Sequence, residues 1–417
     1  MPHRPPLSRR ALLSGLGALG IGAGALVAAG DDDFDGSDWP MYRHDAAGTA
    51  HAPDASVPRE QPTELWTHEF ESLGFTTPAP ILHDGRVFVA RQSLTAFDVE
   101  SGDRVFRIGS ENNATEFLST PAVASARAYV TPSLVAASED GLRAVGIDGG
   151  PDLPVVDGGA LSQRWSTGQQ PDESILTSMG FGGGWQSPPV AAAERVFTVD
   201  DGIVAVEASS GSIQWRTTFD ALAARPAVVD GRLFTVAYDG SLSEYAVADG
   251  TQRWTAPTPA VRQERQPTVA NGSVYLAHET GVTAFDPDGG DERWTRGQPV
   301  GEYGRYVTPP SVTSDAVYAV GSGLLDDETD GLIALDAATG DRLWDASLSG
   351  ISEDEDGPAV AGDVVLQPDN HSLRAFDAAT GDPLWQIQRD AQVSQPAVGD
   401  GRFYLTDGRS ITAYGGT

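Results

Sequence analysis

The sequence predicts an all-β protein, an eight-bladed β-propeller whose blades are four-stranded antiparallel sheets. The segment ALDAATGDRLW at 334–344 returns as AFDAATGDPLW at 375–385, 41 residues further along. Similarity at a fixed period of about 40 residues is typical of repeat proteins, and four short strands per repeat are typical of propeller blades. Two anchor residues, one near each end of the repeat, give the number of blades.

The first anchor is an aromatic residue, which in most repeats follows a glycine by four positions, as Trp344 follows Gly340. We expect it on the outer strand of each blade, where a large ring can pack against the neighbouring blade. Phe106 stands for the tryptophan in one repeat, and Trp66 and Trp165 lack the glycine. The eight blade-docking residues predicted in this way are Trp66, Phe106, Trp165, Trp215, Trp254, Trp294, Trp344 and Trp385.

The second anchor is a proline with a large apolar residue eight positions later, as in Pro226 and Phe234, and it also occurs eight times. The first tryptophan segment, 64–70, has no proline strand before it. The last proline strand, within 396–414, has no tryptophan strand after it. We therefore expect the N-terminal strand to complete the last blade and to close the ring, since closure removes two open sheet edges. An open array or two smaller propellers are the alternatives.

Turn residues support four strands in each repeat. Asp230-Gly231 separates two short apolar runs, and Asp84-Gly85, Asn271-Gly272 and Asp400-Gly401 recur at the same point of other repeats. Such pairs favour two-residue hairpins in which both central residues have positive φ. In the DAATG turn, the Asp carboxylate can accept backbone N–H groups, and the glycine can adopt a left-handed conformation.

The composition excludes several classes of function. The 417 residues contain no Cys, so a disulfide, a thiolate nucleophile and a cysteine zinc site are excluded. All 27 basic residues are Arg, against 59 acidic ones, giving a net charge of −32. Nucleic acid is not an expected partner, because its phosphates must be neutralised by cations. We interpret the acidity as a solvated surface suited to high salt, where the screening length falls to about 3 Å.

The N-terminal segment predicts export. Arg9 and Arg10 precede the uncharged run 11–29, which ends in small residues before Gly30. A basic start, an apolar run and a small-residue end are typical of a secretory signal, here of twin-arginine type. The alternative is an uncleaved membrane anchor, so residues 11–29 could tether the protein to a membrane. The predicted organisation is a signal or anchor at 1–29, an acidic linker and arm at 30–60, and the propeller at 61–417, outside the cell or on its surface.

The repeat A-[FL]-D-x-x-[TS]-G-x-x-x-W resembles the pyrroloquinoline quinone (PQQ) repeat over roughly residues 61–417. The segment DWPMYRHDAAGTA at 38–50 resembles the first segment of secreted PQQ-repeat propellers, and the acidity resembles that of haloarchaeal members. The resemblance implies a ring of eight blades. It covers both BamB-like envelope assembly factors, which are non-catalytic scaffolds, and quinoprotein alcohol dehydrogenases, so the repeat alone does not decide the function.

The resemblance also bears on catalysis and partners. Quinoprotein dehydrogenases of this type carry adjacent cysteines beside PQQ and an Asp base beside Ca²⁺. This chain has no cysteine, and no Asp matches that base, so we assign no catalytic residue. We expect a monomeric scaffold without a cofactor that binds envelope or cell-surface proteins. The alternative is a PQQ- and Ca²⁺-dependent dehydrogenase that oxidises alcohols or sugars.

Candidate binding residues lie in or beside the long segments between strands, the largest of which is 166–188. Arginines and aromatic side chains on one face could hold a planar anion or an acidic peptide by bidentate hydrogen bonds and stacking. The alternative is that these arginines pair with the abundant Asp and Glu side chains. The candidates are Trp185, Arg225, Arg262, Arg265, Tyr303, Arg305 and Tyr306.

Two acidic segments resemble the start of a calcium loop, namely DDDFDG at 31–36 and DDETDG at 326–331. Carboxylate oxygens suit Ca²⁺, so Asp326, Glu328 and Asp330 are candidate ligands. The twelfth position of each loop, where such loops carry a bidentate Glu, holds Tyr42 or Ala337 instead. Chance matches in an acid-rich chain are therefore the alternative.

Overall fold

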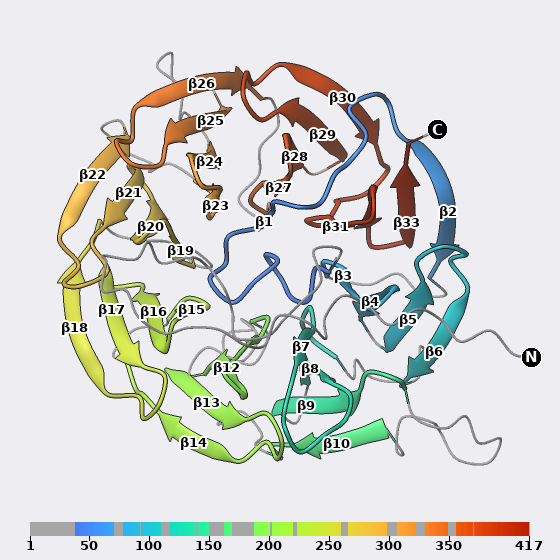
Figure 1. The fold of residues 1–417 in the computed structure, drawn as a ribbon, viewed down its shortest axis with the longest axis horizontal. Coiled ribbons are helices and arrows are strands. Elements are labelled where there is room, and N and C mark those ends of the chain that lie inside the picture. Colours follow the sequence, from blue (N-terminus) through green and yellow to red (C-terminus); the bar gives the residue numbers. More distant parts are fainter. Residues whose placement is uncertain are drawn as a thin grey trace, which may run out of the picture.

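The computed structural model forms a ring of eight β-sheets around a central axis (Figure 1). Seven sheets have four strands, and the eighth carries one short additional strand. The prediction of eight four-stranded blades is confirmed. The described residues are 38–70, 78–91, 93–109, 117–138, 141–149, 162–168, 187–200, 202–219, 223–259, 266–297, 307–321, 330–348, 356–369 and 371–416. The predicted signal or anchor at 1–29 lies outside them.

We number the blades along the chain, and in each the strands run from the axis outwards. Blade 1 holds β3 (Ile81–His83), β4 (Arg86–Ala90), β5 (Leu94–Asp98) and β6 (Arg104–Ile108). Blade 2 holds β7 (Ala122–Ala124), β8 (Ser133–Ser138), β9 (Gly141–Gly146) and β10 (Gln163–Ser166). Blade 3 holds β11 (Val190–Ala192), β12 (Arg195–Val199), β13 (Ile203–Glu207) and β14 (Ile213–Arg216). Blade 4 holds β15 (Ala227–Val229), β16 (Arg232–Ala237), β17 (Ser241–Ala246) and β18 (Gln252–Pro257).

The second half of the chain repeats this order. Blade 5 holds β19 (Thr268–Ala270), β20 (Ser273–His278), β21 (Gly281–Phe285) and β22 (Glu292–Gly297). Blade 6 holds β23 (Ser311–Val312), β24 (Ala316–Gly321), β25 (Gly331–Asp336) and β26 (Arg342–Ser347). Blade 7 holds β27 (Ala359–Ala361), β28 (Val364–Pro368), β29 (Ser372–Asp377) and β30 (Pro383–Gln388), with the added β1 (His51–Ala52). Blade 8 holds β31 (Ala397–Gly399), β32 (Arg402–Thr406) and β33 (Ser410–Gly415), followed by β2 (Thr63–Glu69).

The ring closes in blade 8, where the N-terminal strand β2 is the outer strand of a sheet made otherwise from the end of the chain. β2 pairs antiparallel with β33, with Trp66 opposite Ala413 and Thr67 opposite Thr412. The predicted closure by the N-terminal strand is therefore confirmed. In Figure 1 the blue β2 lies beside the dark red β33.

The first hairpins of blades 1, 4, 5 and 8 have the geometry that the sequence predicts. Asp230 and Gly231 have φ values of 48° and 72°, and the pairs at 84–85, 271–272 and 400–401 are alike. Positive φ at both central residues matches the right-handed twist of the flanking strands. Blade 3 reaches the same turn with Ala193 and Glu194, at 51° and 57°, without a glycine.

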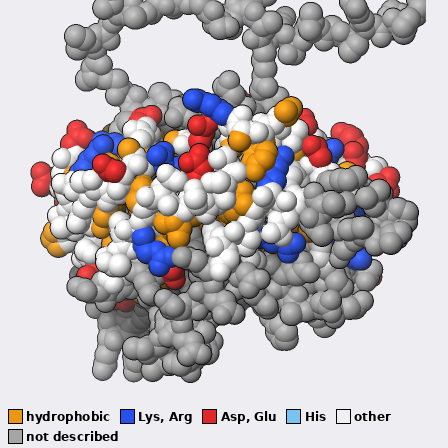
Figure 2. Space-filling model, turned by 90° about the horizontal axis from the view of Figure 1, so that it is seen from below, with side chains coloured by type: hydrophobic (Ala, Val, Ile, Leu, Met, Phe, Trp, Pro, Cys, Tyr) orange, Lys and Arg blue, Asp and Glu red, His pale blue; other side chains and the backbone are white. Residues whose placement is uncertain are grey.

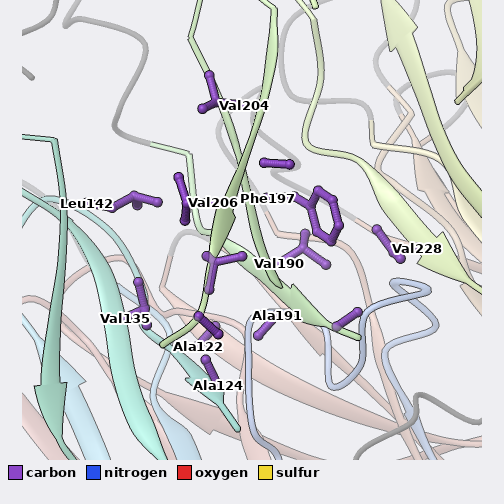
Figure 3. Packing of buried hydrophobic residues seen from close by; sticks show 14 of the residues in the cluster. Ala122, Ala124, Val135, Leu142, Val190, Ala191, Phe197, Val204, Val206 and Val228 are labelled. Atoms are coloured by element: carbon purple, nitrogen blue, oxygen red, sulfur yellow. The ribbon is translucent and has the colours of Figure 1, made fainter. Parts of the chain in front are cut away.

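The core lies between the blades, where the side chains of neighbouring sheets meet. Figure 3 shows Val206 of blade 3 facing Leu142, Val135 and Ala122 of blade 2, while Val190 lies on the opposite face of blade 3, towards blade 4. All five side chains are fully buried. Burial of an aliphatic side chain of Val or Leu size contributes about 1.5–3 kcal/mol, so these interfaces hold adjacent blades together.

Candidate functional site

The N-terminal arm, which we define as residues 38–57, passes through the middle of the ring (Figure 1). Its backbone bonds to the innermost strands rather than to one sheet. Trp39 and Leu82 exchange two backbone hydrogen bonds of 2.9 and 2.8 Å, and β1 pairs in parallel with β27. Further backbone N–H groups of inner strands donate to the arm from Val123, Val228, Val269, Val312 and Val360. The arm therefore contacts six blades in turn and occupies the axis.

Arg43 is the most deeply buried charge of the arm, with no exposed surface. Its guanidinium donates to the carbonyl of Gly48 at 3.1 Å, and to those of Pro309, at 3.3 Å, and Pro310. Burial lowers the pKa of Arg43, although the nearby Asp356 opposes this. The side chain joins the arm to the start of blade 6.

Tyr42 and Asp356 join the arm to blades 7 and 8. The Tyr42 hydroxyl donates to Asp356 Oδ1 at 2.5 Å, and the backbone N–H of Gln395 donates to Oδ2 at 2.7 Å. Burial raises the pKa of Asp356, and these two hydrogen bonds partly offset that effect. The Gln395 amide also donates to the carbonyls of Gly357 and Pro358, at 3.0 and 3.2 Å.

Arg225 is the predicted binding residue that the structure describes, and it is 5% exposed. Its guanidinium donates to Pro188 O at 3.1 Å, to Gln266 Oε1 at 3.0 Å and to Tyr42 O at 3.2 Å. Burial lowers the pKa of Arg225 to about 9. The side chain thus connects blades 3, 4 and 5 to the arm, and its donors are used by groups of this chain.

Several of these buried residues share one position of the repeat. Arg225, Gln266 and Gln395 each directly precede the proline that leads into an inner strand. The residue before a proline is restricted to extended backbone, which suits a chain segment turning into an inner strand. The repeat contained this signal, whereas Tyr42, Arg43 and Asp356 as axial residues were not predicted.

The other predicted binding residues cannot be placed with Arg225. Trp185, Arg262, Arg265, Tyr303, Arg305, Tyr306, Asp326 and Glu328 lie outside the described residues. Asp330 is described: it precedes β25, and its carbonyl accepts the Leu348 N–H at 2.9 Å. Within the described ranges, no three His, Asp or Glu side chains gather as metal ligands.

The predicted blade-docking aromatics lie on the outer strands, one in each blade. Trp344 illustrates the contact: its Nε1 donates to Ala378 O of blade 7 at 2.9 Å, and its ring covers Gly381. A Cβ at Gly381 would lie 2.5 Å from the indole ring, so the close approach requires glycine. The other tryptophans donate in the same way to carbonyls of Val99, Ala208, Val247, Pro287, Ala337 and, for Trp385, Pro58 of the N-terminal chain.

The axial residues allow a test of whether PQQ fits. A planar tricarboxylate on the axis would need cationic groups with free N–H donors. Arg43 and Arg225 donate instead to carbonyl and amide oxygens of the chain, and the arm fills the space. The axial residues that the structure describes therefore do not fit this cofactor. In the same described residues, no helix is long and apolar enough to span a membrane.

Comparison with known proteins agrees with the fold and the repeat. A family described as "Outer membrane protein assembly factor BamB" matches residues 152–325 and 323–415. The matched regions make up more than half of the sequence. The chain therefore belongs to this family of PQQ-repeat propellers.

Individual relatives are more distant. BamB of Burkholderia pseudomallei is 29% identical over 188 residues, which is 43% of this chain and 47% of that protein. The serine/threonine-protein kinase AfsK of Streptomyces griseus is 28% identical over 153 residues, 34% of this chain and 18% of the kinase. The matched part thus spans less than half of each curated relative.

Solved structures share the fold at low identity. BamB from Moraxella catarrhalis has a TM-score of 0.58 and 13% identity, with 85% of this chain and 100% of that chain covered. Quinohemoprotein alcohol dehydrogenase from Comamonas testosteroni has a TM-score of 0.63 and 14% identity, with 91% and 81% covered. BamB and an alcohol dehydrogenase thus share this ring, and the fold alone does not separate the two kinds of protein.

Proposed function

We propose that the protein is an exported, non-catalytic scaffold that binds an envelope or cell-surface protein through the face where outer strands connect to the next inner strands. Membership of the BamB family supports this proposal. An archaeal host, if the acidic composition reflects one, would require a partner other than an outer-membrane assembly complex. The segment with Arg9 and Arg10 supports export, with residues 11–29 either cleaved or kept as a tether.

The observation that carries the proposal is the set of buried, hydrogen-bonded residues at which the connections of this face end. Arg225, Gln266 and Gln395 stand at the ends of three such connections, and all three are buried. Arg225 bonds directly to the arm, and Gln395 reaches it through Asp356 and Tyr42. Loops that vary on a rigid scaffold commonly carry binding, and here the scaffold fixes where each loop starts.

The strand β10 offers a matched test, because the chain connects at its two ends to opposite faces of blade 2. The connection to β11 contains residues 169–186, and the connection from β9 contains residues 150–161. We expect that replacing 169–186 with a short Gly-Ser linker abolishes capture of a cross-linked partner from envelope extract. The same replacement of 150–161 should leave capture unchanged. Equal capture by both variants would contradict the proposed face.

The rival function is a quinone-dependent dehydrogenase, and a direct assay separates the two. The purified protein is supplied with PQQ and Ca²⁺ at high salt, and dye-linked oxidation of alcohols and sugars is followed. We expect no turnover and no change in the fluorescence of PQQ on mixing. Turnover that requires both additions would replace the scaffold proposal with the enzyme.

A further inference from the structure

The rim of the ring divides into two arcs that differ at one position of the repeat. In every blade the strand register shifts by one residue at the docking aromatic, so the residue before it is left out of the pairing. A bulge of this kind bends the strand locally. We call this residue the bulge residue. In blades 2–5 it is polar, namely Arg164, Gln214, Arg253 and Arg293, and in blades 6, 7, 8 and 1 it is apolar, namely Leu343, Leu384, Leu65 and Val105.

The polar bulge residues are used by their own blades. Arg164 donates to Thr131 O at 2.7 Å, Arg253 donates to Glu244 at 2.7 Å, and Arg293 donates to Ser273 Oγ at 2.6 Å. Figure 2 shows a side of the rim where blue and red side chains lie among apolar ones. Arg164 also lies over the ring of Tyr129, 4.2 Å from its centroid.

Three of the four apolar bulge residues are exposed: Leu343 is 54% exposed, Val105 44% and Leu65 42%. Leu384 of blade 7 is partly buried. Isolated exposed apolar residues are ordinary, but apolar side chains at one repeat position in four consecutive blades, three of them exposed, form a pattern.

A groove lies within this apolar arc, between blades 6 and 7, with a volume of about 510 Å³. Ala346 and Ser347 of β26 form one wall. Leu384, Phe376 and Arg374 contribute to the other. A volume in this range is ordinary for a binding site, and apolar walls with a few polar groups suit a side chain of a partner.

The charges at the groove indicate the nature of the occupant. Arg374 pairs with Asp369 at 3.2 Å and Arg342 with Asp345 at 3.3 Å, so both cations are compensated. Asp382, which directly precedes Pro383 of the groove lining, accepts a hydroxyl hydrogen bond from Thr380 and forms no ion pair within the described residues. A basic segment would find complementary charge there. At low salt, where charges are little screened, a second copy of the chain, with a net charge of −32, would be repelled.

We propose that the groove between blades 6 and 7 binds an extended segment of a partner protein that carries apolar side chains next to Arg or Lys. The apolar side chains occupy the space beside Leu384 and Ala346, and a basic one faces Asp382. This rim site is separate from the loop face of the proposed function, so either can fail without the other.

The probe for this test is a fluorescent ten-residue peptide of alternating Leu and Arg, and fluorescence anisotropy measures its binding to the full chain. One control peptide has Glu for Arg, and another has Ser for Leu. Leu384→Arg copies the residue type of blades 4 and 5, and we expect it to weaken binding at least about tenfold. Gln214→Arg, at the same position of blade 3, should leave binding unchanged.

The cysteine-free chain allows the contact to be located. Gln386→Cys, which places a thiol in the groove lining, should react with a bromoacetyl form of the peptide, whereas Gln214→Cys should not. If Leu384→Arg fails to fold, Leu384→Gln, the residue type found in blade 3, replaces it. Equal binding of the Ser-for-Leu peptide, equal labelling of both cysteines or no binding up to about 1 mM would each overturn the proposal. So would a dimer in sedimentation that Leu384→Arg abolishes, because it would assign the groove to a second copy.

Discussion

The axis and the rim of the ring are held together by opposite means. At the rim the same contact recurs, in which an indole ring lies over a glycine of the next blade and donates to its backbone. At the axis, where backbone hydrogen bonds to the arm do recur, the polar side-chain contacts each occur once, as in Arg43 with the carbonyls of Gly48 and Pro309. Each rim contact therefore buries apolar surface between two neighbouring blades. The axis depends on the geometry of one arm, so a single change there should have the larger effect.

The largest effect is expected from Arg43→Met, which keeps the size of the side chain and removes its donors. Three carbonyls would lose a partner, and the buried Asp356 would lose the nearest cation. We expect a loss of about 5 kcal/mol in the free energy of unfolding. Denaturant unfolding at constant high salt measures it. Arg127→Met is the control, since that side chain is 92% exposed, and a similar loss there would contradict the role of the axis.

The next effect concerns the rim and follows from Trp344→Ala. The side chain is 9% exposed, and its loss leaves a cavity between blades 6 and 7. We expect a loss of about 4 kcal/mol. Trp344→Phe keeps a ring but removes the N–H to Ala378, as Phe106 does naturally in blade 1, and should cost about 1 kcal/mol. Calorimetric unfolding compares the two variants, and an equal loss for both would show that the hydrogen bond, not the ring, holds the blades.

Two glycines allow the cost of the left-handed backbone to be measured apart from the cost of displacing the indole ring. Gly381 and Gly401 both have a φ of 75°, but a Cβ at Gly381 meets Trp344, while at Gly401 nothing lies within 4 Å. Gly401→Ala should cost only the left-handed backbone, about 1 kcal/mol. Gly381→Ala should cost about 3 kcal/mol because the ring must also move. Equal losses in thermal unfolding would mean that the indole does not need the glycine.

The smallest expected effect is a pH dependence at the axis. Burial lowers the pKa of His51 from 6.5 to about 4, so the folded protein favours the neutral imidazole. The unfolded chain binds the proton first, and stability is therefore lost as the pH falls from about 6.5 towards 4, by about 2 kcal/mol. His51→Gln, which cannot be protonated, should flatten the stability profile in this window. The exposed His371→Gln should keep the slope, and identical profiles for both variants would exclude His51 as the cause.

The same contrast explains how much the sequence could predict. Features that recur in several repeats of the sequence were predictable. They are the number of blades, the positive-φ hairpins and the outer-strand position of Trp344 and its equivalents. Ring closure followed from the phase of the two anchors. The axial contacts were not predictable in this way, since Tyr42 and Asp356 are 314 residues apart and have no counterpart in other repeats. Of the predicted binding residues, Arg225 could be placed, and it lies inside the ring with its donors engaged.

The pairing of β2 with β33 has a consequence for when the protein can become functional. Residues 63–69 leave the ribosome early, yet their partner strand ends at residue 415. Until β33 has been synthesised, blade 8 is incomplete, and β2 has no strand to pair with. Completion of the ring therefore requires that the chain has been made at least as far as residue 415, and any transport machinery that accepts only folded cargo would have to wait for this strand.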